Sequence, residues 1–283
     1  MQNKTVTGII GNPIKYSLSP VIHQHWMSMN NINSQYNLYE LEKHEVPAFL
    51  GNMSKNKIRG INVTVPFKRE VMPYLDEITE DALALGAVNT IKVGEKNKLF
   101  GFNTDAYGFM QHLTMTAPHW KEKKGAITVI GAGGASRAVI WSFLKENKNE
   151  IRIVNRNKKR ALSLIEDMNK LFPEAHIIFC KESNEALLNS ALLVNCSSLG
   201  MKGQPDLEVC LEKMNKEAII YDIVYNPLQT KLLDKAKALN LTSIDGIGML
   251  LNQAAPAFEL WYNKKVIVTD TLRNKVIEHL GRS

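Results

Sequence analysis

A glycine-rich turn constrains the fold of this chain more than any other stretch. Residues 126–130 are almost continuously apolar and indicate a buried strand, the turn GAGGAS follows at 131–136, and residues 137–145 are typical of a helix. A second strand is predicted at 151–155, which places the turn inside one β-α-β unit. Because such a unit connects parallel strands through a helix, the segment predicts an α/β fold with a parallel sheet.

The same turn has a composition that suits phosphate binding. Glycines let the backbone approach a pyrophosphate closely, and the start of the following helix presents N–H groups that have no partner within the helix. The segment therefore predicts a dinucleotide site. Its candidate residues are Gly131, Ala132, Gly133, Gly134 and Ala135.

The end of the next predicted strand indicates which dinucleotide is bound. A site for NAD usually has an acidic residue there, which binds the ribose hydroxyls. Asn155 and Arg156 occupy this place, and basic residues continue at 158–160. A guanidinium can bind a 2′-phosphate through two hydrogen bonds, and no carboxylate is present to repel it, so the sequence favours NADP over NAD. The residues at 158–160 can also be explained as the solvated start of a helix.

The first 115 residues repeat the alternation of strands and helices. Three strands with helical segments between them imply a second parallel sheet, and two more strands precede an apolar helix. The strands are expected at 6–10, 36–41, 60–65, 86–93 and 99–102, and helices at 20–29, 46–57 and 107–115.

Polar residues gather around the end of the strand at 60–65. Its alternation places Asn62 and Thr64 on one face and apolar residues, including Val65, on the other, and Pro66 ends the pairing because it has no N–H to donate. Lys68 is then left near the carboxyl end of the strand, where ligands bind in open α/β sheets. The pattern predicts a crevice with an amide, a hydroxyl and an ammonium group. The alternative is a half-exposed strand followed by a solvated lysine.

Two serines precede the first helix. Ser19 followed by Pro20 is a standard helix start, so Ser19 is expected to cap the helix. Ser17 has no such structural explanation, and two hydroxyl groups beside the positive end of a helix would suit a carboxylate. His23 and His25 do not share a helix face, which argues against a metal site.

Further polar residues allow both a structural and a functional interpretation. Asp105 could cap the helix that follows it, and Asn89 could make a purely local hydrogen bond. In the apolar helix at 247–261, Gln253 falls among residues expected to be buried, where its amide would need a partner, whereas Asn252 is expected on the solvent side. An inward amide of this kind is expected at a functional site.

Length and composition limit the class of protein. A chain of 283 residues, 45% hydrophobic and 22% charged, can bury substantial cores and is expected to form two domains. Without a signal-peptide pattern or an apolar run of transmembrane length, it is expected in the cytoplasm. The net charge of +7 comes from scattered basic residues, which favours small anionic ligands over nucleic acid. The cysteines lack disulfide or zinc spacing and are interpreted as core residues. They are Cys180, Cys196 and Cys210.

Together these segments resemble the shikimate dehydrogenase family over essentially the whole chain. Several independent blocks occur in the same order as in that family, and most of them contain the polar residues discussed above. The blocks lie at 11–20 (GNPIKYSLSP), 62–68 (NVTVPFK), 86–90 (GAVNT), 103–105 (NTD), 131–137 (GAGGASR), 155–156 (NR) and 245–255 (DGIGMLLNQAA).

The resemblance implies an α/β fold of two domains. Residues 1–115, completed by 246–283, would form a substrate-binding catalytic domain with a parallel sheet. Residues 116–245 would form a Rossmann-type domain that binds NADP. The family likeness further implies that the active site lies in a cleft between these domains.

The resemblance also implies a reaction and a set of site residues. The reaction is the reversible, NADPH-dependent reduction of 3-dehydroshikimate to shikimate, in the chorismate pathway to the aromatic amino acids, with no metal. Lys68 and Asp105 would form the catalytic pair, and Asn62 would be a neighbour of the site. Gly246 and Met249 would lie beside the nicotinamide, while the glycine turn and residues 155–156 bind the rest of NADP. The substrate would be bound by Ser17, Ser19, Thr64, Asn89, Asp105, Tyr225 and Gln253.

Two alternatives stay open. One is a quinate/shikimate dehydrogenase that uses NAD, against which Asn155 and Arg156 argue. The other is a catalytically silent regulator that binds NADP, against which the presence of Lys68 and Asp105 argues. The expected partner is a small-molecule substrate, with no nucleic acid and no membrane, and the chain is expected to be a monomer or a homodimer.

Overall fold

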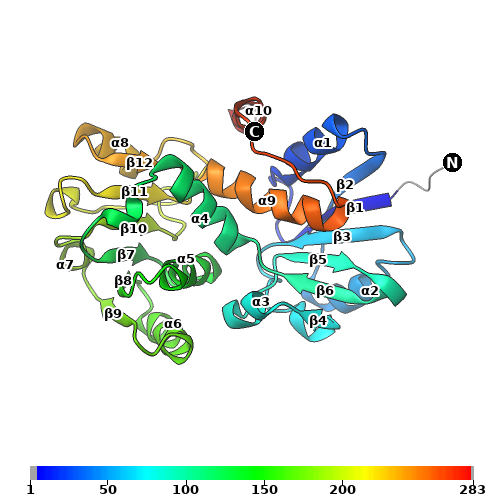
Figure 1. Ribbon diagram of the computed structural model, residues 1–283, viewed down its shortest axis with the longest axis horizontal. Coiled ribbons are helices and arrows are strands. Elements are labelled where there is room, and N and C mark those ends of the chain that lie inside the picture. The colour runs from blue at the N-terminus through cyan, green and yellow to red at the C-terminus, as the bar shows by residue number, and fades with distance from the viewer. Residues whose placement is uncertain (1–4, 282–283) are drawn as a thin grey trace. The chain divides into compact units, whose positions relative to one another are not determined.

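A computed structural model describes residues 5–281 of the chain (Figure 1). The chain divides into two compact units, of which unit 1 comprises Met1–Asp105 and Leu251–Ser283, and unit 2 comprises Ala106–Leu250. Each unit contains a six-stranded sheet with helices packed on it, so the predicted α/β class is confirmed. Within residues 5–281, none of the helices combines the length and hydropathy that a membrane-spanning segment needs.

Unit 2 has a fully parallel sheet in the order β12-β11-β10-β7-β8-β9. The chain passes from β7 to β8 and β9 on one side and then returns to β10 on the other side of β7. In open sheets of this kind, ligands bind at the carboxyl ends of the strands beside such a reversal. The strands are β7 (Ile127–Ile130), β8 (Glu150–Val154), β9 (His176–Cys180), β10 (Leu192–Asn195), β11 (Ile219–Asp222) and β12 (Thr242–Ile244).

Helices bury both faces of this sheet. In β7, Ile127 and Val129 face a core that α4, α5 and α6 complete, whereas Ile130 faces a second core with α8. This two-sided burial explains why the strands are almost continuously apolar. Asn157 caps α6 and Thr230 caps α8 through their side chains. The helices are α4 (Asp105–Thr116), α5 (Gly134–Lys145), α6 (Lys158–Leu171), α7 (Ser183–Ala186) and α8 (Lys231–Ala238).

Unit 1 has a mixed sheet in the order β2-β1-β3-β5-β6-β4. β1, β2 and β3 are parallel, as the sequence predicted, but β5 runs antiparallel to both β3 and β6. The reason is that the chain after β3 returns to the same edge of the sheet, where the Val88 N–H donates to the Lys68 carbonyl at 2.8 Å. The strands are β1 (Thr5–Gly11), β2 (Ser34–Glu40), β3 (Ile58–Val63), β4 (Glu77–Ile78), β5 (Thr90–Val93) and β6 (Leu99–Phe102).

A tight contact attaches the last part of α9 to the sheet of unit 1. The Trp261 indole Nε1 donates to the Ile91 carbonyl at 3.0 Å, and a Cβ at Gly60 would overlap the indole. A glycine in β3 is therefore required for α9 to approach this closely. The helices of this part are α1 (Ser19–Met29), α2 (Val46–Gly51), α3 (Glu80–Leu85), α9 (Ile247–Tyr262, which begins in unit 2) and α10 (Asp270–Gly281). Short 3₁₀ helices are η1 (Lys43–Glu45), η2 (Met72–Tyr74), η3 (Glu95–Asn97), η4 (Trp120–Glu122) and η5 (Leu211–Lys213).

The burial of a few side chains differs from what the sequence patterns predicted. Val65 is 69% exposed, because β3 ends before it and the alternation no longer applies. Asn252 is only 7% exposed, because α9 is buried on most of its circumference. Of the cysteines, Cys196 is buried, while Cys180 and Cys210 are partly exposed. The helix expected at 46–57 ends at its sixth residue and continues as turns.

Candidate active site

Loops of unit 1 converge at one edge of its sheet. β1, β3 and β6 point the same way, so the residues that follow them lie at the same edge. These loops carry Ser17, Lys68 and Asp105. β5 points the opposite way, so it begins at that edge, directly after Asn89. The antiparallel strand, which the sequence did not predict, is thus the reason that Asn89 lies beside the other loops.

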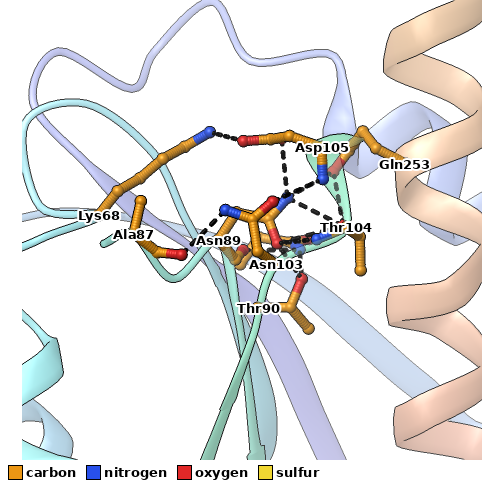
Figure 2. A network of polar contacts seen from close by, with 9 residues as sticks. Lys68, Ala87, Asn89, Thr90, Asn103, Thr104, Asp105 and Gln253 are labelled. Atoms are coloured by element: carbon orange, nitrogen blue, oxygen red, sulfur yellow. Dashed lines mark hydrogen bonds and ion pairs between the residues drawn. The ribbon is translucent and has the colours of Figure 1, made fainter. Parts of the chain in front are cut away.

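Lys68 and Asp105 form an ion pair at this edge (Figure 2). Lys68 Nζ donates to Asp105 Oδ2, and the side chains keep 24% and 12% of their surface exposed. Lys68 lies in the turn after β3, and Asp105 is the first residue of α4. Because little water surrounds the pair, its attraction is screened less than that of an exposed ion pair. The structure therefore brings together the two residues that were predicted as a catalytic pair.

Asn89 holds the carboxylate from its other side (Figure 2). Its Nδ2 donates to Asp105 Oδ1 at 2.8 Å, and its Oδ1 accepts the backbone N–H of Thr104 at 2.9 Å. Asn103 accepts the Asp105 N–H at 3.0 Å and donates to the Ala87 carbonyl at 2.9 Å. Both carboxylate oxygens of Asp105 thus have a donor, which fixes their orientation. The bond from Asn89 is not the local one that the sequence left open.

Gln253 reaches the same cluster from α9. Its Oε1 lies 3.3 Å from Asn89 Nδ2 and 3.5 Å from Thr104 Oγ1. Figure 2 shows its side chain directed toward these residues. The prediction that this amide points inward is confirmed, and Asn89 and Thr104 are the polar partners that it was expected to need.

The two serines at the start of α1 do not have the roles that the sequence predicted for capping the helix. The helix begins at Ser19 itself, and Leu18 occupies the N-cap position without a side-chain hydrogen bond. Ser17 Oγ instead accepts the N–H of Ser19 at 3.3 Å. Pro20 has no N–H that a cap would satisfy, so the serine two residues before the helix takes the available donor. Thr64, the other predicted residue, directly follows β3 and bonds through its N–H to the Ile10 carbonyl at 3.0 Å.

Of the polar residues behind Asn89, Tyr36 and Thr90 were not predicted as part of the site, whereas Asn62 was expected beside it. Thr90 is fully buried and donates to Asn89 Oδ1 at 3.0 Å, and Asn62 Nδ2 donates to Thr90 Oγ1 at 3.1 Å. Tyr36 in β2 donates its hydroxyl proton to Asn62 Oδ1 at 2.7 Å. The available signal was a polar residue at a buried strand position, but only the pairing of β3 with β5 brings these side chains together.

The glycine turn of unit 2 has the backbone geometry that its sequence predicted. Gly131 has a φ of +112°, and a Cβ there would lie 3.0 Å from the Cys196 carbonyl oxygen. Only glycine suits this position at the reversal between β7 and β10. α5 begins at Gly134, where a Cβ would meet no atom within 4 Å. The helix start therefore faces open space, which fits a pyrophosphate.

Basic residues lie beside this turn. Asn155 Nδ2 donates to the Asn157 carbonyl at 2.8 Å, and Asn157 Oδ1 accepts the Arg160 N–H at 3.1 Å as the cap of α6. Arg156 is exposed just after β8. The Arg160 guanidinium lies 3.9 Å from the position of a Cβ at Gly133. Arg160 is exposed, as a solvated helix start implies, and the capped first turn of α6 also places its guanidinium beside the glycines.

A buried carboxylate fixes the loop that carries Tyr225. Asp222, at the end of β11, accepts hydrogen bonds from Asn195 at 2.9 Å, Thr230 at 2.8 Å and the Val224 N–H at 3.0 Å. Burial raises the pKa of Asp222, and these bonds oppose the shift. Tyr225 follows in this loop, and burial raises the pKa of its phenol as well.

The predicted nicotinamide neighbours lie at the start of α9 in unit 2. Gly246 is buried against the Ile223 carbonyl, with which a Cβ would overlap. Met249 is partly buried and packs against the core that α4, α5 and α6 share. The backbone just after β11 and the start of α9 therefore approach each other closely in unit 2.

Comparisons with known proteins identify the family. One family model, the shikimate dehydrogenase substrate binding domain, matches residues 9–91, and another, shikimate / quinate 5-dehydrogenase, matches residues 114–247. A relative from Rhodospirillum rubrum, named shikimate dehydrogenase (NADP(+)), is 39% identical over 273 residues, which are 96% of each chain.

Solved structures agree with the sequence comparisons. A crystal structure of a shikimate dehydrogenase in complex with NADP+ is 32% identical, with a TM-score of 0.88 over 98% of this chain and 96% of that one. Shikimate 5-dehydrogenase from Thermus thermophilus, in complex with NADP(H) and shikimate, is 30% identical, with a TM-score of 0.82 over 98% and 99%. The chain therefore belongs to the shikimate dehydrogenase family.

Proposed function

We propose that this chain catalyses the reversible, NADP-dependent conversion of 3-dehydroshikimate to shikimate. The observation that carries the proposal is the Lys68–Asp105 ion pair, held by Asn89 at the edge of the unit 1 sheet where ligands of α/β proteins bind. The family supplies the substrate class, because the Rhodospirillum rubrum relative is named a shikimate dehydrogenase that uses NADP(+).

Lys68 provides the proton and the positive charge that the reaction needs. NADPH supplies the hydride when it is bound. As the ring ketone is reduced, negative charge grows on its oxygen, and the Lys68 ammonium stabilises that charge and donates a proton to the oxygen. In the reverse direction, neutral Lys68 accepts the proton of the substrate hydroxyl. The carbonyl thereby becomes an alcohol without a free alkoxide.

Asp105 positions Lys68 and the substrate. Asn89 holds one carboxylate oxygen and Lys68 Nζ lies on the other, so the ammonium is confined although a lysine side chain is flexible. The same carboxylate can accept a hydrogen bond from a ring hydroxyl. Fixing these groups before the substrate arrives removes reorganisation from the chemical step.

The remaining polar residues are assigned to the substrate's other groups. Ser17 and Ser19 would bind the carboxylate, because their hydroxyls lie at the positive end of α1. Tyr225 is assigned to the same group on the family likeness alone. The ring hydroxyls would be bound by Thr64, Asn89, Asp105 and Gln253.

Unit 2 would hold the cofactor. The residues from Gly131 to Ala135 would bind the pyrophosphate at the open start of α5. Asn155 and Arg156 would bind the 2′-phosphate, and Arg160 is added to them because its guanidinium lies beside Gly133. Gly246 and Met249 would contact the nicotinamide. This set of donors fits NADP better than NAD, since two guanidinium groups are available for the extra phosphate.

Steady-state rates with two substrates and two cofactors test the proposal. The formation of reduced nicotinamide is followed with shikimate or quinate and with NADP+ or NAD+. We expect the highest kcat/KM for shikimate with NADP+. A higher value for quinate with NAD+ would favour the quinate alternative, and no reduction of either cofactor by either substrate would favour the silent regulator.

Three further properties are testable. The cytoplasmic location would be tested by cell fractionation, and the choice between monomer and homodimer by light scattering coupled to size-exclusion chromatography. A role in aromatic amino acid synthesis would be tested by deleting the gene, after which growth should require the aromatic amino acids.

A further inference from the structure

A continuous chain of hydrogen bonds runs from β2 to the ion pair. Starting at Tyr36, each side chain donates to the next one, through Asn62, Thr90 and Asn89, until Asp105 is reached. The four distances are 2.7, 3.1, 3.0 and 2.8 Å in that order. We call these five residues the Tyr36 chain.

The chemistry of its members fixes the direction of every donor. The ionised Asp105 only accepts, so Asn89 must present its NH2 to it and its oxygen to Thr90. The N–H of Thr104, which bonds to the same oxygen at 2.9 Å, independently requires this orientation. Thr90 must then donate to Asn89 and can accept only from the Asn62 NH2. Asn62 Oδ1 is left facing Tyr36, whose hydroxyl is its donor.

The end of the Tyr36 chain that lies farthest from Asp105 is tightly packed and buried away from water. Tyr36 is 3% exposed, and its ring is stacked on His23 with a centroid distance of 4.5 Å and an interplanar angle of 3°. Burial raises the pKa of Tyr36 well above its usual value, although the side chain of Ser19 opposes the shift, so the phenol keeps its proton for Asn62. Thr90 is fully buried and Asn62 is 5% exposed, so water does not readily replace a lost partner.

We infer that Tyr36 is a positioning residue for the reaction, which acts through Asn62, Thr90 and Asn89 to hold the Asp105 carboxylate toward Lys68. The inference rests on the proposed function for its role in catalysis, and on the hydrogen bonds alone for its effect on Asn89. Without the Tyr36 hydroxyl, the Asn62 side-chain oxygen loses its donor, and the Asn62 amide can rotate so that its NH2 and oxygen exchange places. Thr90 then no longer has to donate its proton to Asn89. The hydrogen bond from Asn89 that orients the Asp105 carboxylate is weakened, although Tyr36 contacts neither Lys68 nor Asp105.

A matched control exists in the same unit. Tyr262 is also largely buried, and its hydroxyl bonds to Thr7 Oγ1 at 3.0 Å and to Ser34 Oγ at 2.9 Å. Neither partner belongs to the Tyr36 chain. Tyr262→Phe therefore removes a buried phenol hydroxyl, as Tyr36→Phe does, with comparable general consequences for packing. The hydroxyl that it removes does not belong to the hydrogen bonds that lead to Asn89.

The kinetic test compares Tyr36→Phe, Thr90→Val, their double variant and Tyr262→Phe. We expect Tyr36→Phe and Thr90→Val each to lower kcat about 3- to 10-fold, the loss of one hydrogen bond, while KM for shikimate changes less than about twofold. Because both act through Asn89, the double variant should be no slower than the worse single one. Tyr262→Phe should keep the wild-type kcat. The inference would be overturned if the kcat losses of Tyr36→Phe and Thr90→Val multiplied in the double variant. It would also be overturned if Tyr36→Phe and Tyr262→Phe lost kcat equally.

A second measurement does not depend on turnover. Hydrogen exchange of the side-chain NH2 groups of Asn62 and Asn89, followed by NMR, should accelerate in Tyr36→Phe and stay unchanged in Tyr262→Phe. Unchanged exchange at Asn89 in Tyr36→Phe would refute the inference even if the enzyme is active. If the wild-type protein does not oxidise shikimate, the proposed function fails, and accelerated exchange would still support the structural role of Tyr36.

Discussion

At the scale of single residues, Lys68 and Asp105 differ from an ordinary surface ion pair only in their surroundings. Lys43 and Glu70 form an ion pair at 2.9 Å with 74% and 40% of their side-chain surfaces exposed, whereas Lys68 and Asp105 keep 24% and 12%. Removing one partner of the exposed pair leaves the other in water. Removing Lys68 leaves a carboxylate largely cut off from water.

Lys68→Ala is predicted to lower kcat by about 10²- to 10⁴-fold, because it removes the general acid. KM for shikimate should change only a few-fold, since other residues bind the substrate. Lys43→Ala, which removes the same charge from the same unit, should keep the wild-type kcat. Near-full activity of Lys68→Ala would show that another group supplies the proton.

Arg156→Ala is predicted to raise KM for NADP+ about 10- to 100-fold, the loss of a charged hydrogen bond to the 2′-phosphate. KM for NAD+ should not change, because NAD+ lacks this phosphate. Lys170→Ala, at the other end of α6, is the control for the loss of one positive charge in this unit. An equal rise in KM for both cofactors would place Arg156 away from the 2′-phosphate.

Sequence patterns could indicate charged site residues that follow a strand, but not the buried residues whose hydrogen bonds support them. Lys68 follows a strand and is charged, which is a local signal, whereas Asp105 suits a helix cap equally well and was assigned to the site only through the family resemblance. Tyr36 and Thr90 are polar residues inside buried strands, and their partners come from other strands, so their connection depends on pairing that no single segment contains. Ser19 was misassigned because a serine before a proline suits a cap and a first helical residue equally well.

At the scale of elements, the glycine turn was predictable and the direction of β5 was not. The turn is a local feature, since strand, glycines and helix follow one another in the sequence. An apolar strand looks the same whether it pairs parallel or antiparallel, and only the return of the chain to the Lys68 edge determines the direction of β5. That direction brings Asn89 to Asp105.

Gly134→Val is predicted to block the cofactor without disturbing the fold. No atom lies within 4 Å of a Cβ at this position, so the new side chain should extend into the space where the pyrophosphate would bind. The melting temperature should stay within about 2 °C of the wild type, which corresponds to less than about 0.5 kcal/mol. NADP+ binding measured by calorimetry should be lost. Retained NADP+ affinity would show that the phosphates bind elsewhere.

At the scale of the whole molecule, a buried histidine makes stability depend on pH. Burial lowers the pKa of His23 to about 3, although the neighbouring Asn62 side chain opposes the shift. In the unfolded chain a histidine has a pKa of about 6.5. Between these values the unfolded state binds a proton and the folded state does not, so the free energy of unfolding falls as the pH decreases, by up to about 1.4 kcal/mol per pH unit.

His23→Phe is predicted to remove this contribution. Urea unfolding of both proteins from pH 7 to pH 4 should show that the stability of the variant, relative to the wild type, increases as the pH falls. The other titrating groups are common to both proteins and cancel in the difference. Parallel stability curves would mean that His23 is protonated in the folded protein as readily as in the unfolded one.

In the proposed reaction, a hydride passes from NADPH to the ring ketone of 3-dehydroshikimate while Lys68 supplies the proton. The most direct measurement uses NADPH labelled with deuterium on one or the other face of the nicotinamide C4, with mass spectrometry of the product. We predict shikimate that carries one deuterium from one of the two labelled cofactors and none from the other. Product without deuterium from either cofactor, or no shikimate at all, would contradict the account.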